Sequence, residues 1–422
     1  MEKIREIFLT STFKQSSLTM FGTVTNGFLG AVFYILVARY LGPAQFGLFS
    51  IATLVLNMVA DIGDLGTNTG LVRFVSANRI DNPEKANRFL KLGFEVKLIA
   101  AFVIGIVGVS LSSWITVFLF KKPELAPLLR IAFIGVSGSL LFSFILTTLQ
   151  AYERFWSWSL IQVISNAGRI VLIFLFFRFI NVSAFTSMGA YILIPMLGFV
   201  GGLFVTSTKF FNVKGEITEI KDFFHYNKWV ALFTLIAAVS GRLDSFLTAR
   251  YLTVFEIGIY AAATRVTQIV PQLVGAISTV VAPKMANVGS KKELVEYIKK
   301  TQIFVIAIAI LGILSIPVVS YFIPILFGSA YTASVPIFIV LFFAMLVLLI
   351  SIPIHTAVFY YFSYPKLFVY ISTGHLLIVA LAGYFFIPTY GVMAIAYSVL
   401  AAGIFGFVVP SIWVYRKLFK NI

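Results

Sequence analysis

Long apolar segments alternate with short polar connections along the whole chain. A membrane-spanning helix needs about 20 mostly apolar residues, and the pattern predicts twelve such segments. In the first half they cover 16–39, 46–69, 94–119, 126–150, 157–179 and 184–207. In the second half they cover 228–250, 255–283, 301–323, 333–360, 366–387 and 391–415. We therefore predict an all-α, polytopic membrane protein.

The two halves of the chain repeat one another. The tetrapeptide Ala-Arg-Tyr-Leu at 38–41 recurs at 249–252, and Gly47 recurs as Gly258 at the same offset of 211 residues, half of the 422. Self-similarity at a fixed offset indicates two copies of one structural unit. We predict an N-terminal six-helix bundle at 1–207, a cytoplasmic linker at 208–227 and a C-terminal six-helix bundle at 228–422.

Composition supports the membrane assignment. Hydrophobic residues make up 60% of the chain and charged residues 11%, with a mean hydropathy of +0.99, whereas a soluble domain has about 25% charged residues. The net charge of +16 is concentrated in alternate connections, around 73–97, 209–228 and 284–300. Basic residues favour cytoplasmic loops, so we expect both termini in the cytoplasm, an inner or plasma membrane location and no nucleic-acid partner.

Several polar side chains fall inside the predicted spans. An ionisable group at the bilayer centre costs at least about 2.5–3.5 kcal/mol, so we expect these groups to face water or each other. Three segments carry polar residues at helical spacing. These stripes are Asn57, Asp61, Asp64 and Asn68; Gln162, Ser165, Asn166 and Arg169; and Arg265, Gln268, Gln272 and Thr279.

The repeat relates the first stripe to the third. Asn57 corresponds to Gln268 and Asp61 to Gln272 at the offset of 211, which predicts that both stripes face one central cavity. Two alternatives stay open: the stripes could only hold helices together in lipid, or the acids could be wetted at the membrane surface. Arg242 and Asp244 are two residues apart, so we do not expect them to pair.

The sequence resembles a known family at two places. The run Ala-Arg-Tyr-Leu-Gly-Pro-Ala-Gln-Phe-Gly-Leu at 38–48 resembles the hallmark of polysaccharide-type flippases of the multidrug/oligosaccharidyl-lipid/polysaccharide (MOP) exporter superfamily. Asp244, Tyr251, Ala262 and the run 258–260 resemble that family's seventh-to-eighth-span pattern. The resemblance implies a V-shaped pair of six-helix bundles around a central cavity, working by alternating access.

The resemblance also implies the cargo, a lipid-linked oligosaccharide moved from the inner to the outer leaflet for cell-surface polysaccharide or glycoprotein biosynthesis. Its polyprenyl pyrophosphate is anionic, and arginines are suited to bind it. The expected substrate-binding residues are Arg242, Arg265, Arg169, Asn57, Gln268, Gln272 and Asn166. Candidates for coupling to H+ or Na+ are Asp61, Asp64 and Asp244. We expect no catalytic residue, no other cofactor and no metal site, because the chain has no cysteine and its three histidines lack metal spacing.

The nearest competing interpretation is a cation-coupled multidrug exporter of the same superfamily, which would favour acidic over basic cavity residues. A sugar porter of the major facilitator type would carry a basic, glycine-rich loop signature, which this sequence lacks. A non-transporting scaffold stays open as an alternative. The predicted outer connections are too short for the catalytic loop of a glycan polymerase or ligase, so we do not expect an enzyme. The expected partners are the lipid-linked oligosaccharide, membrane lipids and such polymerase or ligase machinery, with the protein itself a monomer.

Overall fold

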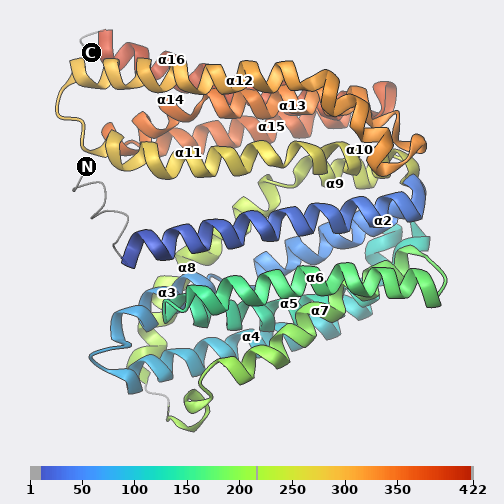
Figure 1. The fold of residues 1–422 in the computed structure, drawn as a ribbon, viewed down its shortest axis with the longest axis vertical. Helices are drawn as coiled ribbons and strands as arrows, with labels where there is room; N and C mark the ends of the chain where they lie inside the picture. Colours follow the sequence, from blue (N-terminus) through green and yellow to red (C-terminus); the bar gives the residue numbers. More distant parts are fainter. Residues whose placement is uncertain (1–10, 215–216, 420–422) are drawn as a thin grey trace. The chain divides into compact units, whose positions relative to one another are not determined.

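The structure is a computed structural model that describes residues 11–214 and 217–419, and within these residues it contains helices and no strand. The prediction of an all-α protein is confirmed. The described chain forms two compact units. The first runs to Leu41 and resumes over Leu48–Arg242, while the second contains Gly42–Gly47 and continues from Leu243 (Figure 1).

The helices are long and apolar enough for a multi-pass membrane protein. Nine described helices meet this criterion, or eleven when two bent pairs are each counted as one span. The predicted total of twelve crossings stays a prediction. The domain boundaries at 207 and 228, which are inferred from the internal repeat, also stay a prediction. The packing itself groups residues up to Arg242 with the first unit.

Helix α2 (Ser11–Gly63) covers the first two predicted segments. It consists of two helices that meet at Gly42, where φ is +69°. An L side chain is strained at such an angle and glycine is not, so this residue sets the position of the kink. Pro43 follows at once, and its fixed φ is compatible with the first turn of the next helix.

The second part of α2 ends earlier than predicted. The helix stops at Gly63, Leu65 and Gly66 adopt positive φ angles of 51° and 73°, and α3 (Thr67–Asn78) begins in a new direction. The expected stripe from Asn57 to Asn68 is therefore not one continuous helical face. Only Asn57 and Asp61 lie on α2.

Four long helices, which run beside one another in Figure 1, and α8 complete the first unit. Asn82 begins α4, because its side chain accepts a hydrogen bond from the Lys85 backbone N–H and Pro83 occupies the first helical position. The bounds are α4 Pro83–Trp114, the π-helix η1 Ile115–Leu119, η2 Pro123–Leu125, α5 Ala126–Ala151, α6 Phe155–Phe179, α7 Ala184–Val205, η3 Lys209–Asn212 and α8 Ile217–Ser240.

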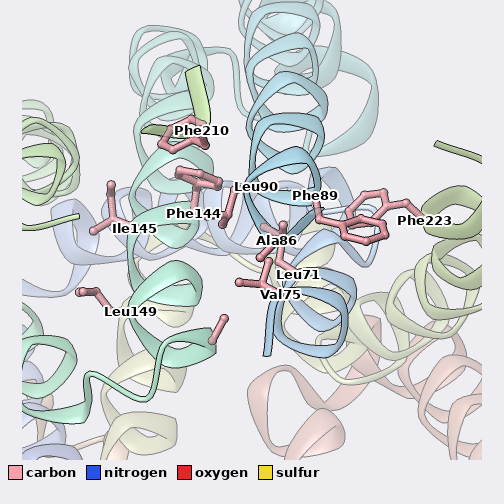
Figure 2. Packing of buried hydrophobic residues seen from close by; sticks show 11 residues of the cluster. Leu71, Val75, Ala86, Phe89, Leu90, Phe144, Ile145, Leu149, Phe210 and Phe223 are labelled. Atoms are coloured by element: carbon pink, nitrogen blue, oxygen red, sulfur yellow. The ribbon is translucent and has the colours of Figure 1, made fainter. Parts of the chain in front are cut away.

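An aromatic and aliphatic cluster ties α8 to the first unit (Figure 2). Phe223 of α8 lies 6.2 Å from the ring of Phe89 on α4, and Phe74 of α3 stacks on Phe89 at 4.6 Å. Farther along α8, Asn227 packs against Gly70 of α3, where a Cβ would collide with the amide. The later part of the predicted linker is thus helical and packs along α3 and α4.

The second unit begins where the predicted segment 228–250 is broken. That segment forms two helices, α8 and α9, separated at Gly241 and Arg242. The remaining bounds are α9 Leu243–Tyr251, α10 Val254–Thr267, α11 Ile269–Ala286, α12 Lys291–Phe327, η4 Ser329–Tyr331, α13 Ser334–Ile350, α14 Ile352–Thr356, the π-helix η5 Ala357–Tyr361, α15 Lys366–Tyr390 and α16 Val392–Phe419.

Two glycines related by the repeat meet inside the second unit. A Cβ on Gly47 would collide with the backbone of Val254, and a Cβ on Gly258 would collide with the backbone of Pro43. Only glycine permits backbones to approach so closely. The repeat therefore places the same residue on both sides of one tight contact, which fixes the segment 42–47 against α10.

Candidate functional site

Polar side chains from α2, α6 and α7 converge inside the first unit. Asn166 of α6 donates a hydrogen bond to Asn26 of α2, and Asn26 in turn donates to Gln162 at 3.4 Å. Arg169, one turn along α6, donates from Nη1 to Asn166 Oδ1 at 3.1 Å. The predicted stripe on the fifth span thus contacts a polar residue of the first span.

Tyr191 of α7 holds the other side of this network. The Arg169 guanidinium lies 4.4 Å from the centroid of the Tyr191 ring, within range of a cation–π interaction. The Tyr191 hydroxyl donates to Asn57 Oδ1 at 3.5 Å and accepts from the Tyr34 hydroxyl at 3.4 Å. Through Tyr191, the structure brings Asn57, Asn166 and Arg169 into one cluster, which we call the Arg169 cluster.

Tyr191 is not among the residues that polar spacing selects. It lies in an apolar run of α7 with no charged neighbour, so nothing in the sequence distinguishes it from an interfacial tyrosine. The only signal is its hydroxyl, which requires a partner when buried. Tyr191 is buried, and its hydroxyl has the partners that burial requires.

Arg242 forms an ion pair with Asp61. The Arg242 Nη2 atom lies 2.6 Å from Asp61 Oδ2, and Nη1 donates to the Ala238 carbonyl at 3.4 Å. Asp61 comes from α2, whereas Arg242 lies at the break after α8. As predicted, Arg242 does not pair with Asp244. The Arg242 and Asp61 side chains are 30% and 47% exposed respectively, so both members of the pair are accessible.

Asp64 forms a second ion pair, with Lys97, which the sequence does not predict. Lys97 follows a basic connection and resembles a loop cation, but it lies in α4 with no exposed surface, and its Nζ is 2.6 Å from Asp64 Oδ1. Ser143 Oγ accepts from the same Nζ at 2.7 Å. The Asp64 carboxylate also accepts from Thr67 Oγ1 and the Asn68 backbone N–H. This pair joins the turn after α2 to α4 and α5.

The predicted polar groups of the second unit lie on or beside α9, α10 and α11. Asp244 of α9 accepts a hydrogen bond from the Tyr260 hydroxyl of α10 at 2.5 Å. Arg265 is half-buried on α10, Gln268 lies in the one-residue break before α11, and Gln272 is exposed on α11. The structure does not join Asp244 to the glutamines through any hydrogen bond among the described residues.

Comparison with known proteins places the chain in a family. The model of the family described as "Polysaccharide biosynthesis protein" matches residues 13–289. The search of curated proteins found no significant match.

Solved structures share the fold over nearly the whole chain. The inward closed structure of the lipid II flippase MurJ aligns with a TM-score of 0.75 and 17% identity, covering 94% of this chain and 87% of that one. An inward-facing multidrug resistance MATE family transporter aligns with a TM-score of 0.69 and 15% identity, covering 94% and 96%. A MOP superfamily transporter from Pyrococcus furiosus aligns with a TM-score of 0.59 and 15% identity, covering 96% and 95%.

Because these identities are low, the alignments establish the fold alone, and this fold is that of MOP-superfamily transporters. The match to the family model extends over more than half of the sequence and across the first-unit cluster described above. This chain is a multi-pass membrane protein with the MOP-transporter fold, and it belongs to the polysaccharide biosynthesis protein family.

Proposed function

We propose that the protein is a flippase that moves a lipid-linked oligosaccharide, carried on a polyprenyl pyrophosphate, from the inner to the outer leaflet by alternating access. Family membership and the fold shared with a lipid II flippase support this proposal. The observation that carries it is the charge of Arg169. This cation lies in a membrane-spanning helix, and none of the described carboxylates pairs with it.

Arg169 differs in this respect from two other cations of the first unit. Lys97 is neutralised by Asp64 and Arg242 by Asp61. The partners of Arg169 among the described residues are the Asn166 amide and the Tyr191 ring, both uncharged. Its Nε atom is buried and has no hydrogen-bond partner within the described chain.

An unneutralised guanidinium in an apolar span is unfavourable unless an anion compensates it. A pyrophosphate offers several oxygens that match the planar guanidinium donors. Binding the cargo headgroup near Arg169 would supply the missing negative charge and a partner for the Nε donor. Arg169 therefore ranks ahead of Arg242 as the principal headgroup-binding residue.

The remaining features of the proposal follow from the sequence. The protein would act in the plasma membrane with both termini in the cytoplasm, as a monomer that delivers its cargo to glycan polymerase or ligase machinery. Coupling to H+ or Na+ would involve Asp61, whose side chain is 47% exposed, or Asp244, because Asp64 is held in a buried pair with Lys97.

The test is translocation of a fluorescent polyprenyl pyrophosphate-linked oligosaccharide in proteoliposomes. Arg169→Gln should lower the initial rate by about tenfold or more, the scale of a lost charge-assisted hydrogen bond. Arg169→Lys should retain more activity, because it keeps the cation although it cannot make a bidentate contact. The matched control is Arg178→Gln, which removes an exposed arginine from the last turn of the same helix and should leave the rate unchanged.

Two outcomes would contradict the proposal. Equal rates for the parent and Arg169→Gln would remove the role of that cation. Failure of the parent to move the oligosaccharide, together with transport of a cationic drug against a proton or sodium gradient, would favour the multidrug exporter instead.

A further inference from the structure

We propose that Asp61 acts as an internal competitor for the cargo: its carboxylate occupies Arg242 until a pyrophosphate displaces it, so that Asp61 sets how strongly an anion must interact with Arg242 in order to bind. This inference rests on the proposed flippase function and adds a role for the Asp61–Arg242 pair. It concerns residues of the first unit alone.

The geometry of the pair suits exchange of one anion for another. The contact between Arg242 Nη2 and Asp61 Oδ2 is a single short interaction of 2.6 Å, and Nη1 makes only a 3.4 Å hydrogen bond to the Ala238 carbonyl. A guanidinium carries five N–H donors. Most of the donor capacity of Arg242 is therefore uncommitted, and a phosphate that binds through two oxygens would make better use of it.

Exposure separates this pair from the other intramembrane pair. Lys97 is wholly buried and the Asp64 side chain is 13% exposed, and Ser143, Thr67 and Asn68 complete their hydrogen bonds. Such a pair is part of the packing. Asp61, in contrast, is 47% exposed and has no other hydrogen bond among the described residues, so it can leave Arg242 without stranding a buried partner.

The position of Arg242 adds a second argument. It is the last residue of the first unit and lies in the break between α8 and α9, where Gly241 provides backbone freedom. The guanidinium is thus attached to the end of a helix and not to its rigid middle. A small movement of the break would move the guanidinium from Asp61 to a bound headgroup.

Competition with an internal carboxylate raises the affinity that an anion needs in order to bind. Each anion that binds Arg242 must replace the Asp61 carboxylate, and a pyrophosphate meets this cost with more charge and more acceptor oxygens than a monoanion. Removal of Asp61 should therefore strengthen the binding of both anions, and that of pyrophosphate by at least as large a factor, because a displaced carboxylate nearby repels the multiply charged anion more strongly. A purely structural ion pair predicts no gain for either anion.

The experiment is isothermal titration calorimetry of the full-length protein in detergent, with inorganic pyrophosphate and with the monoanion dimethyl phosphate. Asp61→Asn should tighten pyrophosphate binding about two- to fivefold, the range of a partly exposed ion pair. It should tighten dimethyl phosphate binding by the same factor or a smaller one, because both anions pay the same cost to displace Asp61 and the nearby carboxylate repels the monoanion less. The double variant Asp61→Asn/Arg242→Gln should lose the gain, because the contested cation is absent.

The matched control is Glu153→Gln. It breaks the Arg79–Glu153 pair, which has the same 2.6 Å separation and side chains 19% and 50% exposed, but which lies outside the membrane-spanning helices. Its pyrophosphate affinity should equal that of the parent. Thermal unfolding of each variant in the same detergent shows whether the fold is intact.

Unchanged or weaker pyrophosphate binding by folded Asp61→Asn would overturn the competitor role. An equal gain in Asp61→Asn/Arg242→Gln would overturn it as well, because Arg242 would then not be the contested cation. These outcomes are distinct from failure of the flippase proposal, which is decided by translocation of the oligosaccharide by the parent protein and by Arg169→Gln.

Discussion

The two units carry different chemistry at corresponding places, which are matched in α4 and α12 by counting from the N-cap of each helix. Helices α4 and α12 begin in the same way, with Asn82 accepting from the Lys85 backbone N–H at 3.0 Å and Ser290 accepting from the Glu293 backbone N–H at 3.3 Å. Fifteen residues after each cap stand Lys97 and Val305, both with no exposed surface. The same helix position is therefore a buried cation in one unit and a buried aliphatic side chain in the other.

The partner of that cation differs in the same way. Asp64 corresponds at the offset of 211 to Gly275, which has no side chain, and an added Cβ there would meet no atom within 4 Å. The first unit has both members of the ion pair and the second has neither. Position 15 after the cap is thus buried in both units, and the identity of the residue decides whether it is charged. Intramembrane charge is concentrated in the first unit.

The largest effect is expected from breaking the buried pair on one side only. Lys97→Met should destabilise the protein by about 3–5 kcal/mol, because it leaves the Asp64 carboxylate buried without its cation. The measurement is thermal or denaturant unfolding in detergent, followed by tryptophan fluorescence.

The double variant Asp64→Asn/Lys97→Met sharpens this test. It removes both charges while the amide oxygen still accepts from the Asn68 backbone N–H and the amide NH2 group can donate to the Thr67 hydroxyl. We expect it to be more stable than Lys97→Met and close to the parent. If the double variant were less stable than Lys97→Met alone, the pair would not be the reason for the destabilisation.

The next effect concerns the one contact that both copies of the repeat share. Gly47→Ala and Gly258→Ala should each destabilise the protein by about 1–3 kcal/mol or more, because the added methyl group collides with backbone atoms that cannot rotate away. Gly30→Ala is the control, since a Cβ there meets no atom within 4 Å. Gly30 is helical, so alanine should stabilise it slightly. Equal unfolding temperatures for all three variants would exclude the tight contact.

A smaller effect, on transport, should separate the two contributions of Tyr191. Tyr191→Leu removes the ring beneath Arg169, an interaction of about 0.5–2 kcal/mol, and should lower the translocation rate about two- to thirtyfold. Tyr191→Phe keeps the ring and loses only the hydroxyl contacts to Asn57 and Tyr34, so it should retain more activity. Comparable losses in both variants would assign the role of Tyr191 to its hydroxyl.

The sequence predicts much of the fold because membrane helices carry a strong local signal. Apolar segments long enough to span a bilayer identify themselves, and the predicted segments at 126–150 and 157–179 differ from α5 and α6 by only a few residues. Interruptions are harder to predict. The breaks at 64–66 and at Gly241–Arg242 depend on a few backbone angles within continuous apolar runs, which hydropathy does not detect.

The candidate site is predictable residue by residue but not pair by pair. Helical spacing selects Asn57, Asn166 and Arg169, and the structure brings these three together. The pairing of Asp61 with Arg242 joins residues 181 positions apart, and no local pattern encodes such a distance. The sequence does not predict the burial of Lys97, because a lysine near a basic loop is usually solvated. Only the three-dimensional packing reveals its ion pair with the Asp64 carboxylate.

The smallest expected effect tests whether the stripes of the two units are equally accessible to water. Asn57 and Gln268 correspond in the repeat, but Asn57 is half-buried and accepts from the Tyr191 hydroxyl, whereas Gln268 is exposed in the break between α10 and α11. In proteoliposomes, Gln268→Cys should react with a small hydrophilic maleimide a few times faster than Asn57→Cys. The chain has no native cysteine, so each label reports one site. If Gln268→Cys reacts only with a lipid-soluble maleimide, its stripe faces lipid, and the second unit contributes no polar wall at that position. Headgroup recognition would then depend on the first unit, with Arg169 and Arg242 as its cations.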